Sequence, residues 1–321
     1  MASSTRDPVV RSSGGGRRVR RPGDVAFSST AMGAGIIILL VLAAVAIFLT
    51  AESIPAFTGD PAENPILDGR SFAEYVIPLV FGTIWASILA LIIAAPLAIG
   101  IALFISHYAP RRLSAFLGYI IDLLAAVPSV VFGLWGSLVL AGAIQPSFVW
   151  LNDYFGWIFL FDGQVSATGR TILTAALVLA VMILPIMTAI CREVFLQTPS
   201  LHEEAALALG ATRWEMIRMA VLPFARGGMV SAAMLALGRA LGETMAVTMV
   251  LSVSGVISFE LLTSTNPTPI PANIALSFPE AYGDGIAVLI ATGLVLFVLT
   301  FAVNALARWL VNRRKDFSGA N

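Results

Sequence analysis

The chain of 321 residues is 58% hydrophobic and only 12% charged, and its formal net charge is zero. This composition excludes a soluble globular protein. A zero total charge says nothing about partners, so the distribution of charge along the chain carries the information. The single cysteine, Cys191, excludes an intrachain disulfide framework and is expected to be a small buried side chain.

The first 30 residues are rich in Ser, Gly and Arg and include a tight run of four arginines: Arg17, Arg18, Arg20 and Arg21. Residues 1–30 therefore predict a disordered basic tail held near anionic lipid. An apolar stretch follows at 31–51. Its length and the extended tail before it favour an uncleaved first transmembrane anchor, with a cleaved signal peptide as the alternative.

Five more apolar segments are each long enough to cross a hydrocarbon core of about 30 Å, at 76–106, 117–143, 171–191, 227–252 and 286–311. The fold class predicted is therefore an all-α polytopic membrane protein with six transmembrane helices. Pro78 and Pro96 predict a kink or tilt in the second span. Close helix contacts are expected at three glycines of the third span, Gly133, Gly136 and Gly142.

Basic residues are divided unequally between the two sides of these spans. Of the 19 Lys and Arg residues, Arg70 and Arg170 fall in loops on one side, Arg239 lies inside a span, and the rest fall on the other side. The positive-inside rule then places both termini in the cytosol, including a tail at 313–321.

Three loops are expected on the outer side, at 52–75, 144–170 and 253–285. The first is acidic, and the second holds several aromatic residues that indicate an interfacial segment. The third contains a Pro-x-Pro-x-Pro run over 267–271, which predicts a stiff extended piece.

A polar stretch between the fourth and fifth spans predicts two short helices on the cytosolic side. Ser200 with Glu203 forms a capping box for the first helix, and Gly210 is a C-terminal stop. Thr212 begins a second capping box, and Pro223 is expected to end the second helix.

The first of these helices presents a small-residue face made of Ala205, Ala206 and Ala208, with Leu209. Such a face suits close docking in a groove of another protein. An amphipathic helix lying on the membrane would give the same pattern, so the spacing leaves both interpretations open. Flanking membrane spans disfavour a DNA-binding helix-turn-helix, and no nucleic-acid partner is expected.

Charged residues inside the fifth span are the candidate site. Arg239 lies about 18 Å along the helix from the start of that span, near the middle of the bilayer. An arginine there costs about 2.5–3.5 kcal/mol and needs compensation. Glu243, four residues on, is expected on the same helical face, and Asp122 in the third span is another possible partner.

Two interpretations of this charged pair remain. Arg239 and Glu243 can lock helices together, or Arg239 can line a water-filled path for an oxyanion whose oxygens fit its planar guanidinium. On the second interpretation Glu243 prevents the anion from binding too tightly, and Thr244 adds a hydroxyl to the lining.

The polar stretch also contains a recognisable pattern. Glu204-Ala205-Ala206, followed by Gly210 and then Leu222-Pro223, resembles the EAA loop of ABC-importer permeases, with Ala220 at a position where that family usually has Ile. The downstream segment 237–250 resembles the PstC-type permeases of phosphate-specific ABC transporters.

Segments 126–133 and 195–199 support this resemblance, which covers roughly residues 70–312. It implies a type I ABC importer permease (MetI-like) fold with an EAA loop at 197–223. It also implies coupling of the loop to a separate ATPase through Glu203, Glu204, Ala205, Ala206, Leu209 and Gly210. The path residues implied are Arg239 and Glu243; the positions of Asp122 and Thr244 in the chain add these two residues to the predicted path.

The same resemblance implies the function and the partners. The chain would be the permease subunit of an ATP-driven phosphate importer in the bacterial inner membrane. Its partners would be a second permease subunit, a cytosolic ATPase dimer, an extracytoplasmic phosphate-binding protein, inorganic phosphate and membrane lipid. Alternatives are a permease for another oxyanion, the sister permease of the same system and a secondary transporter. A scaffold for a sensor kinase would be an additional role beside transport.

Several chemistries are not expected in this chain. Its single lysine, Lys315, is not in a Gly-rich loop, so no Walker A motif is present and the chain is not itself an enzyme. His107 and His202 lack metal-ligand spacing and are expected to be surface residues. No cofactor or metal is predicted.

Overall fold

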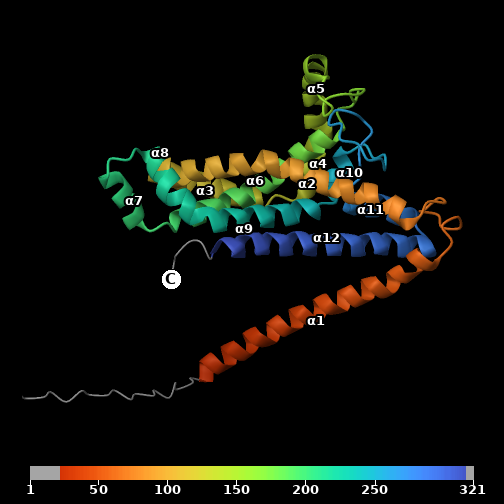
Figure 1. The fold of residues 1–321 in the computed structure, drawn as a ribbon, viewed down its shortest axis with the longest axis horizontal. Helices are drawn as coiled ribbons and strands as arrows, with labels where there is room; N and C mark the ends of the chain where they lie inside the picture. The colour runs from red at the N-terminus through yellow and green to blue at the C-terminus, as the bar shows by residue number, and fades with distance from the viewer. Residues whose placement is uncertain (1–21, 316–321) are drawn as a thin grey trace, which may run out of the picture. The chain divides into compact units, whose positions relative to one another are not determined.

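The computed structural model describes residues 22–315, so the predicted basic run at 17–21 and the final residues 316–321 lie outside the described residues. The chain divides into a first unit that ends at Phe48 and a second unit that begins at Leu49 (Figure 1).

Helix α1, Pro22–Thr58, contains the whole of the predicted anchor at 31–51. It begins at Pro22, before the apolar stretch. Proline is well tolerated in the first turn of a helix, because the N–H groups there have no hydrogen-bond partner within the helix. Its apolar side chains point in all directions, with Ile37, Leu39 and Leu40 each more than half exposed. A helix that is apolar all round is typical of a membrane span.

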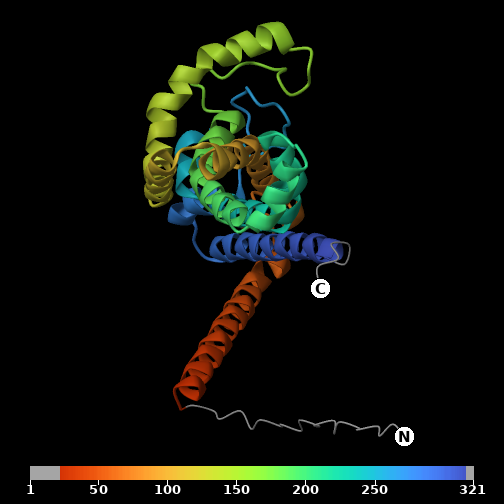
Figure 2. The same ribbon diagram turned by 90° about the vertical axis from the view of Figure 1, so that its left-hand side faces the viewer.

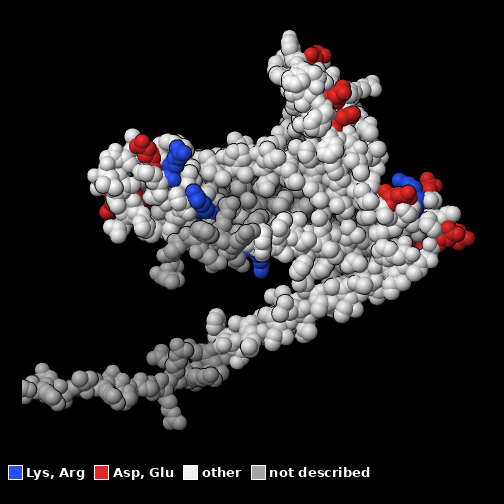
Figure 3. Space-filling model, in the orientation of Figure 1, with Lys and Arg blue, Asp and Glu red and all other residues white. Residues whose placement is uncertain are grey.

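Regular structure in residues 22–315 is helical, apart from two isolated β-bridges. Among the described residues, 6 helices are long and apolar enough to cross a membrane: Ala26–Thr58, Phe72–Tyr108, Ser129–Phe155, Ile172–Leu196, Arg213–Leu241 and Asp284–Trp309. The predicted number of spans is therefore confirmed. Figure 3 shows charged side chains of the second unit near both ends of the bundle and on the arm that rises from it, with one basic side chain on the lower edge between the ends.

The core of the second unit is formed by α2 (Phe72–Leu103), α6 (Ile172–Leu196) and α9 (Leu222–Leu241), and α6 packs against both of the others. Helix α2 contributes a row of alanines at every fourth position, all of them fully or almost fully buried: Ala86, Ala90, Ala94, Ala98 and Ala102. Residues four apart share one face of a helix, and small side chains there let the backbones approach closely. Cys191 of α6 is fully buried, as expected.

The third span differs from the prediction of a single helix at 117–143. Helix α3, Arg111–Ala125, ends before Pro128, and a new helix begins at Ser129. Pro128 disfavours helical backbone at the residue before it and cannot donate a helix hydrogen bond, so the apolar run is split. The span runs on through α4 (Ser129–Trp135), η2 (Gly136–Leu140) and α5 (Ala141–Phe155).

Two of the three glycines in this span make the close contacts that the sequence predicts. A Cβ atom on Gly133 would lie 2.9 Å from Cα of Ala246, and one on Gly136 would lie 2.5 Å from Cγ2 of Val178. Gly142 has open space around it. Gly133 and Gly136 therefore permit close packing against α10 (Met245–Val250) and α6, whereas Gly142 does not have this role. Beyond them α5 extends away from the bundle (Figure 2).

The third outer loop folds back onto the bundle instead of forming an extended piece. Pro269 caps the short helix α11, Ile270–Ser277, and the N–H of Ile270 donates to Oγ1 of Thr83 at 2.9 Å. The buried Asn266 accepts from the N–H of Ile172 at 2.8 Å and donates to the carbonyl of Ser252 at 3.0 Å. These long-range hydrogen bonds fix the ends of α6 and α10 to each other.

The last helix, α12, spans Asp284–Lys315 and packs against α9 and α11. The polar turn between α6 and α9 consists of α7 (Ser200–Ala208) and α8 (Arg213–Met216). It lies at the end of the bundle remote from α11 (Figure 1).

Candidate functional site

The predicted fifth span is broken at the position of its charged residues. Helix α9 ends at Leu241, and the short helix α10, Met245–Val250, begins after Gly242 and Glu243. The expectation of one helix over 227–252 is therefore wrong. Non-helical backbone at membrane depth is tolerated where protein surrounds it or where it lines a cavity, and discontinuous helices often carry binding sites in transporters.

The break separates Arg239 from Glu243. Arg239 lies in the last turn of α9, whereas Glu243 follows the end of that helix. The structure shows no ion pair between them within the described residues. The predicted pairing across one helical face is wrong, because that face ends at Leu241.

Each of the two charges instead lies at a helix end of complementary polarity. A cation in the last turn of α9 is stabilised by the negative end of that helix dipole, and a carboxylate before α10 by the positive end of the next. Glu243 is buried, and its Oε1 accepts a hydrogen bond from the N–H of Ala246 at 3.1 Å. Glu243 therefore satisfies an amide of the first turn of α10, a group that has no partner within the helix.

Arg239 opens onto a cavity of about 720 Å³ formed by α6, α9 and α12. Its lining residues are Ile186, Ser231, Met234, Leu235, Gly238, Arg239, Asn304, Ala307 and Arg308. A Cβ atom on Gly238 would meet nothing within 4 Å, so the space beside the arginine is open. This arrangement keeps the guanidinium accessible and available to a ligand.

The other predicted path residues do not line this cavity. Asp122 is exposed on α3, outside the spanning helices. Thr244 lies in the α9–α10 break, and its Oγ1 donates to the carbonyl of Gly242 at 3.3 Å. Of the four predicted path residues, only Arg239 is among the lining residues.

The coupling segment begins differently from the prediction. The N-cap of α7 is Pro199, which has no side-chain cap hydrogen bond, so the expected Ser200–Glu203 capping box is absent from the structure. The second box is present, with the Thr212 side chain accepting from the N–H of Glu215 and the Glu215 carboxylate accepting from the N–H of Thr212 at 2.8 Å. Gly210 ends the first helix with φ +86°, as its type predicts.

Pro223 does not end the second helix. The chain continues from α8 through a π-helical turn, η3 (Ile217–Val221), directly into α9. A π turn shifts the hydrogen-bond pattern to i→i+5, and Pro223 then falls in the first turn of the following α-helical segment, where its missing N–H is tolerated.

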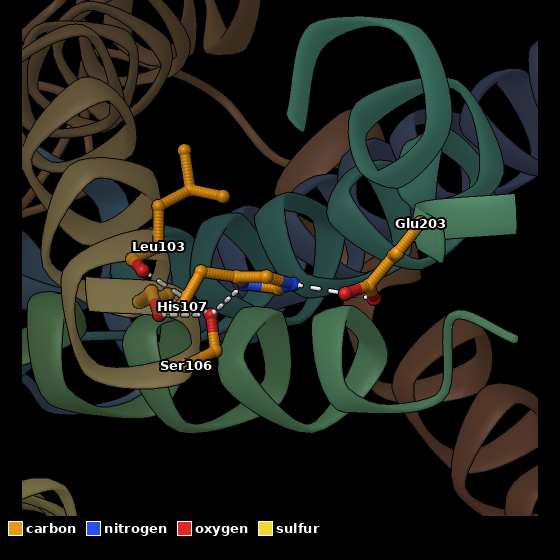
Figure 4. A network of polar contacts seen from close by, with 5 residues as sticks. Leu103, Ser106, His107 and Glu203 are labelled. Atoms are coloured by element: carbon orange, nitrogen blue, oxygen red, sulfur yellow. Dashed lines mark hydrogen bonds and ion pairs between the residues drawn. The ribbon is translucent and has the colours of Figure 1, made fainter. Parts of the chain in front are cut away.

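Glu203 contacts a histidine from a distant part of the sequence. His107 Nε2 lies 3.5 Å from Glu203 Oε1, and His107 Nδ1 lies 2.7 Å from Oγ of Ser106 (Figure 4). The histidine side chain is only 9% exposed, so the prediction of a surface residue is wrong. His107 belongs to η1, Phe104–Tyr108, at the end of the α2 span, so the contact joins that span to α7. Because the two residues lie far apart in the chain, no local spacing reveals it.

The outward surface of α7 and of its C-cap residue carries strongly exposed leucines. Leu201 is 72% exposed and Leu209 is 90% exposed. Glu204, Ala205 and Ala208 are exposed as well. Ala206 instead packs against the core of the bundle, so the predicted small-residue face is divided between the inside and the outside. Exposed leucines on a polar helical turn are typical of an interaction surface.

Comparison with known proteins identifies the family. Residues 94–316 match the model of a family described as "Binding-protein-dependent transport system inner membrane component". The chain is 48% identical to phosphate transport system permease protein PstC 2 of Mycobacterium tuberculosis, over 91% of this chain and 92% of that protein. It is 40% identical to PstC of Mesorhizobium japonicum, over 98% of each chain.

A solved structure supports the fold class. The chain resembles an inward-facing structure of the MetNI methionine ABC transporter with a TM-score of 0.53 and 15% identity, covering 74% of this chain and 95% of that chain. This likeness confirms the predicted MetI-like permease fold and bears on the fold alone. The family match over residues 94–316 and the 48% identity to a relative over nearly the whole chain show that the chain belongs to the binding-protein-dependent transport system inner membrane components.

Proposed function

We propose that this chain is the membrane-spanning permease subunit of an ATP-driven phosphate importer. The observation that carries the proposal is 40–48% identity to phosphate transport permeases over nearly the full length of the chain. The exposed guanidinium of Arg239 in a membrane-embedded cavity supports it, because a planar guanidinium can bind two phosphate oxygens at once.

The proposed mechanism is alternating access. An extracytoplasmic binding protein delivers phosphate to the outer loops, and a second permease subunit completes the path. ATP binding brings two ATPase subunits together on the cytosolic side, where the proposed orientation puts both termini of this chain. The exposed leucines of α7 support docking of an ATPase on this helix. Movement of α7 is passed to the spans through its contact with His107, through its connection to α6 and, by way of α8 and η3, through its connection to α9.

The proposed role of Arg239 is to attract the anion. Its place at the end of α9 lowers the cost of a charge in the membrane without a carboxylate to compete with the ligand. Glu243 acts differently from the earlier expectation: it holds the α9–α10 break in shape by capping α10. Asp122 and Thr244 have no contact that supports a role in the path.

Uptake by the complete transporter in vesicles tests the proposal. Arg239→Gln should reduce phosphate uptake by about 100-fold, the loss expected for a strong charge-assisted contact. Arg226→Gln is the matched control, because Arg226 is an exposed arginine of the same helix that does not line the cavity. Equal uptake by both variants would show that Arg239 does not contribute to a transport path.

The choice of substrate and energy source needs two further measurements. Unlabelled phosphate should compete with labelled phosphate at concentrations at which sulfate does not. Uptake should persist when a proton uncoupler is added while ATP is held constant. Competition by sulfate would indicate another oxyanion, and collapse with the uncoupler would indicate a secondary transporter.

A further inference from the structure

The cavity that contains Arg239 has a second arginine, contributed by a different helix. Arg308 of α12 is exposed and lines the same space, together with Asn304 of the same helix. Asn304 and Arg308 are four residues apart, so they lie on one face of α12, one turn from each other. Ser231 of α9 adds a hydroxyl to the opposite wall.

Neither guanidinium is neutralised by a residue in the described part of the chain. The ion pair in the described part of the structure joins His107 to Glu203, and Arg239 and Arg308 form no hydrogen bond or ion pair with a described side chain. The lining of the cavity contains no carboxylate. Two positive charges that line one cavity repel each other, and a bound anion relieves that repulsion.

We propose that Arg308 and Asn304 form, with Arg239, a site for a phosphate oxyanion between α9 and α12. Arg308 and Arg239 supply charge-assisted donors from two walls, and the Asn304 amide supplies a further donor. A phosphate group has enough oxygens to accept from all three. The inference rests on the proposed function only for the source of this oxyanion: transported phosphate and a lipid headgroup present the same chemistry.

The directions of α9 and α12 set the order of the two arginines along the cavity. Helix α12 carries Arg308 near its C-terminal end, whereas α9 runs from the α7–α8 turn and carries Arg239 at its end remote from that turn. Arg308 therefore lies toward the α7 side of the cavity. An anion leaving Arg239 toward that side would meet Arg308 and Asn304 next.

Cysteine labelling of the assembled transporter tests this site directly. Asn304→Cys places a thiol in the cavity, and Leu306→Cys is the matched control, because Leu306 is 58% exposed and is not a lining residue. The native Cys191 is fully buried, and the unmodified complex serves as the blank. The rate of reaction with an anionic thiol reagent is compared with the rate for a cationic reagent of the same size.

The expected result is faster anionic than cationic labelling at position 304, but not at 306. Inorganic phosphate should slow the anionic reaction at 304 in zwitterionic vesicles. Adding Arg308→Gln should weaken this protection about tenfold or more, in line with the loss of one charged contact. Arg308→Lys keeps the positive charge but loses the planar guanidinium with its paired donors. This variant should weaken the protection by phosphate less than Arg308→Gln does.

The outcomes separate the possible explanations. Protection by inorganic phosphate supports an oxyanion site on the transport route, and protection only by anionic lipid supports an oxyanion site for a headgroup. Absence of charge preference and of protection by either overturns the site. If Arg239→Gln abolishes uptake while Arg308→Gln changes neither uptake nor protection, the proposed function stands and this inference falls.

Discussion

Nε2 of His107 lies 3.5 Å from a carboxylate oxygen of Glu203, and this contact ties the end of the α2 span to the α7 helix (Figure 4). The histidine is held from its other side by Ser106, whose Oγ also donates to the carbonyl of Ala102 at 2.8 Å. Movement of α7 is thereby connected to a span that packs along most of α6.

Breaking this contact should weaken the connection between ATP hydrolysis and transport. For His107→Ala or Glu203→Gln we expect phosphate transported per ATP hydrolysed to fall about two- to fivefold, the effect of losing one partly exposed polar contact. The double variant should be no worse than either single variant, because both remove one interaction. Ser200→Ala is the control, because Ser200 caps nothing. Additive losses in the double variant would contradict a direct coupling.

Glu243 should behave as a helix cap. Glu243→Ala removes the acceptor for the Ala246 N–H and should lower stability by about 1 kcal/mol, whereas Glu243→Gln keeps an oxygen acceptor and should cost less than half of that. Thermal unfolding of the purified transporter measures the difference. Equal destabilisation by both variants would show that the charge, not the hydrogen bond, matters at this position.

Gly210 should be required for the turn between α7 and α8. Its φ of +86° is unfavourable for a residue with a Cβ atom, so Gly210→Ala should cost about 1–2 kcal/mol, although no neighbouring atom blocks the methyl group. Gly227→Ala is the matched control in α9, where the added methyl group also has open space and alanine favours the helix. Uptake and thermal stability should fall for the first variant and not for the second.

Gly136 should tolerate no side chain. A Cβ atom there would lie 2.5 Å from one methyl carbon of Val178 and 2.8 Å from one of Val250, so Gly136→Ala should destabilise the protein by about 1–3 kcal/mol. Gly142→Ala lies farther along the same span in open space and should be neutral. Equal thermal stability of the two variants would mean that α4 and η2 pack less closely against α6 and α10 than the structure shows.

Hydrophobic length allowed the spans to be predicted, but not their interruptions. The apolar runs around 117–143 and 227–252 look continuous because hydropathy averages over a window. The breaks at Pro128 and at Gly242 are local features of the backbone. Pro128 was a visible signal for the first break, since proline removes a helix hydrogen bond. For the second break the available signal was Gly242, because glycine lowers the stability of a helix interior.

The candidate site was predicted only in part for the same reason. Arg239 could be identified from the sequence because placing an arginine in a membrane span costs free energy. This cost does not depend on the residue at which the helix ends. Its assignment to a pair with Glu243 depended on a helix that does not continue. Asn304 and Arg308 belong to a span at the far end of the sequence, and they reach the cavity only because α12 packs against α9.

The sequence by itself determined six spans, a polar turn with Gly210 at its centre and one arginine inside the membrane, because hydrophobic length, turn conformation and the cost of buried charge are local properties of the chain. Only the tertiary structure decided that Glu203 meets His107, that Glu243 caps α10 and that Arg308 shares a cavity with Arg239. These relationships depend on where helices stop and which helices pack together. Long-range packing sets both, and no spacing along the chain records it.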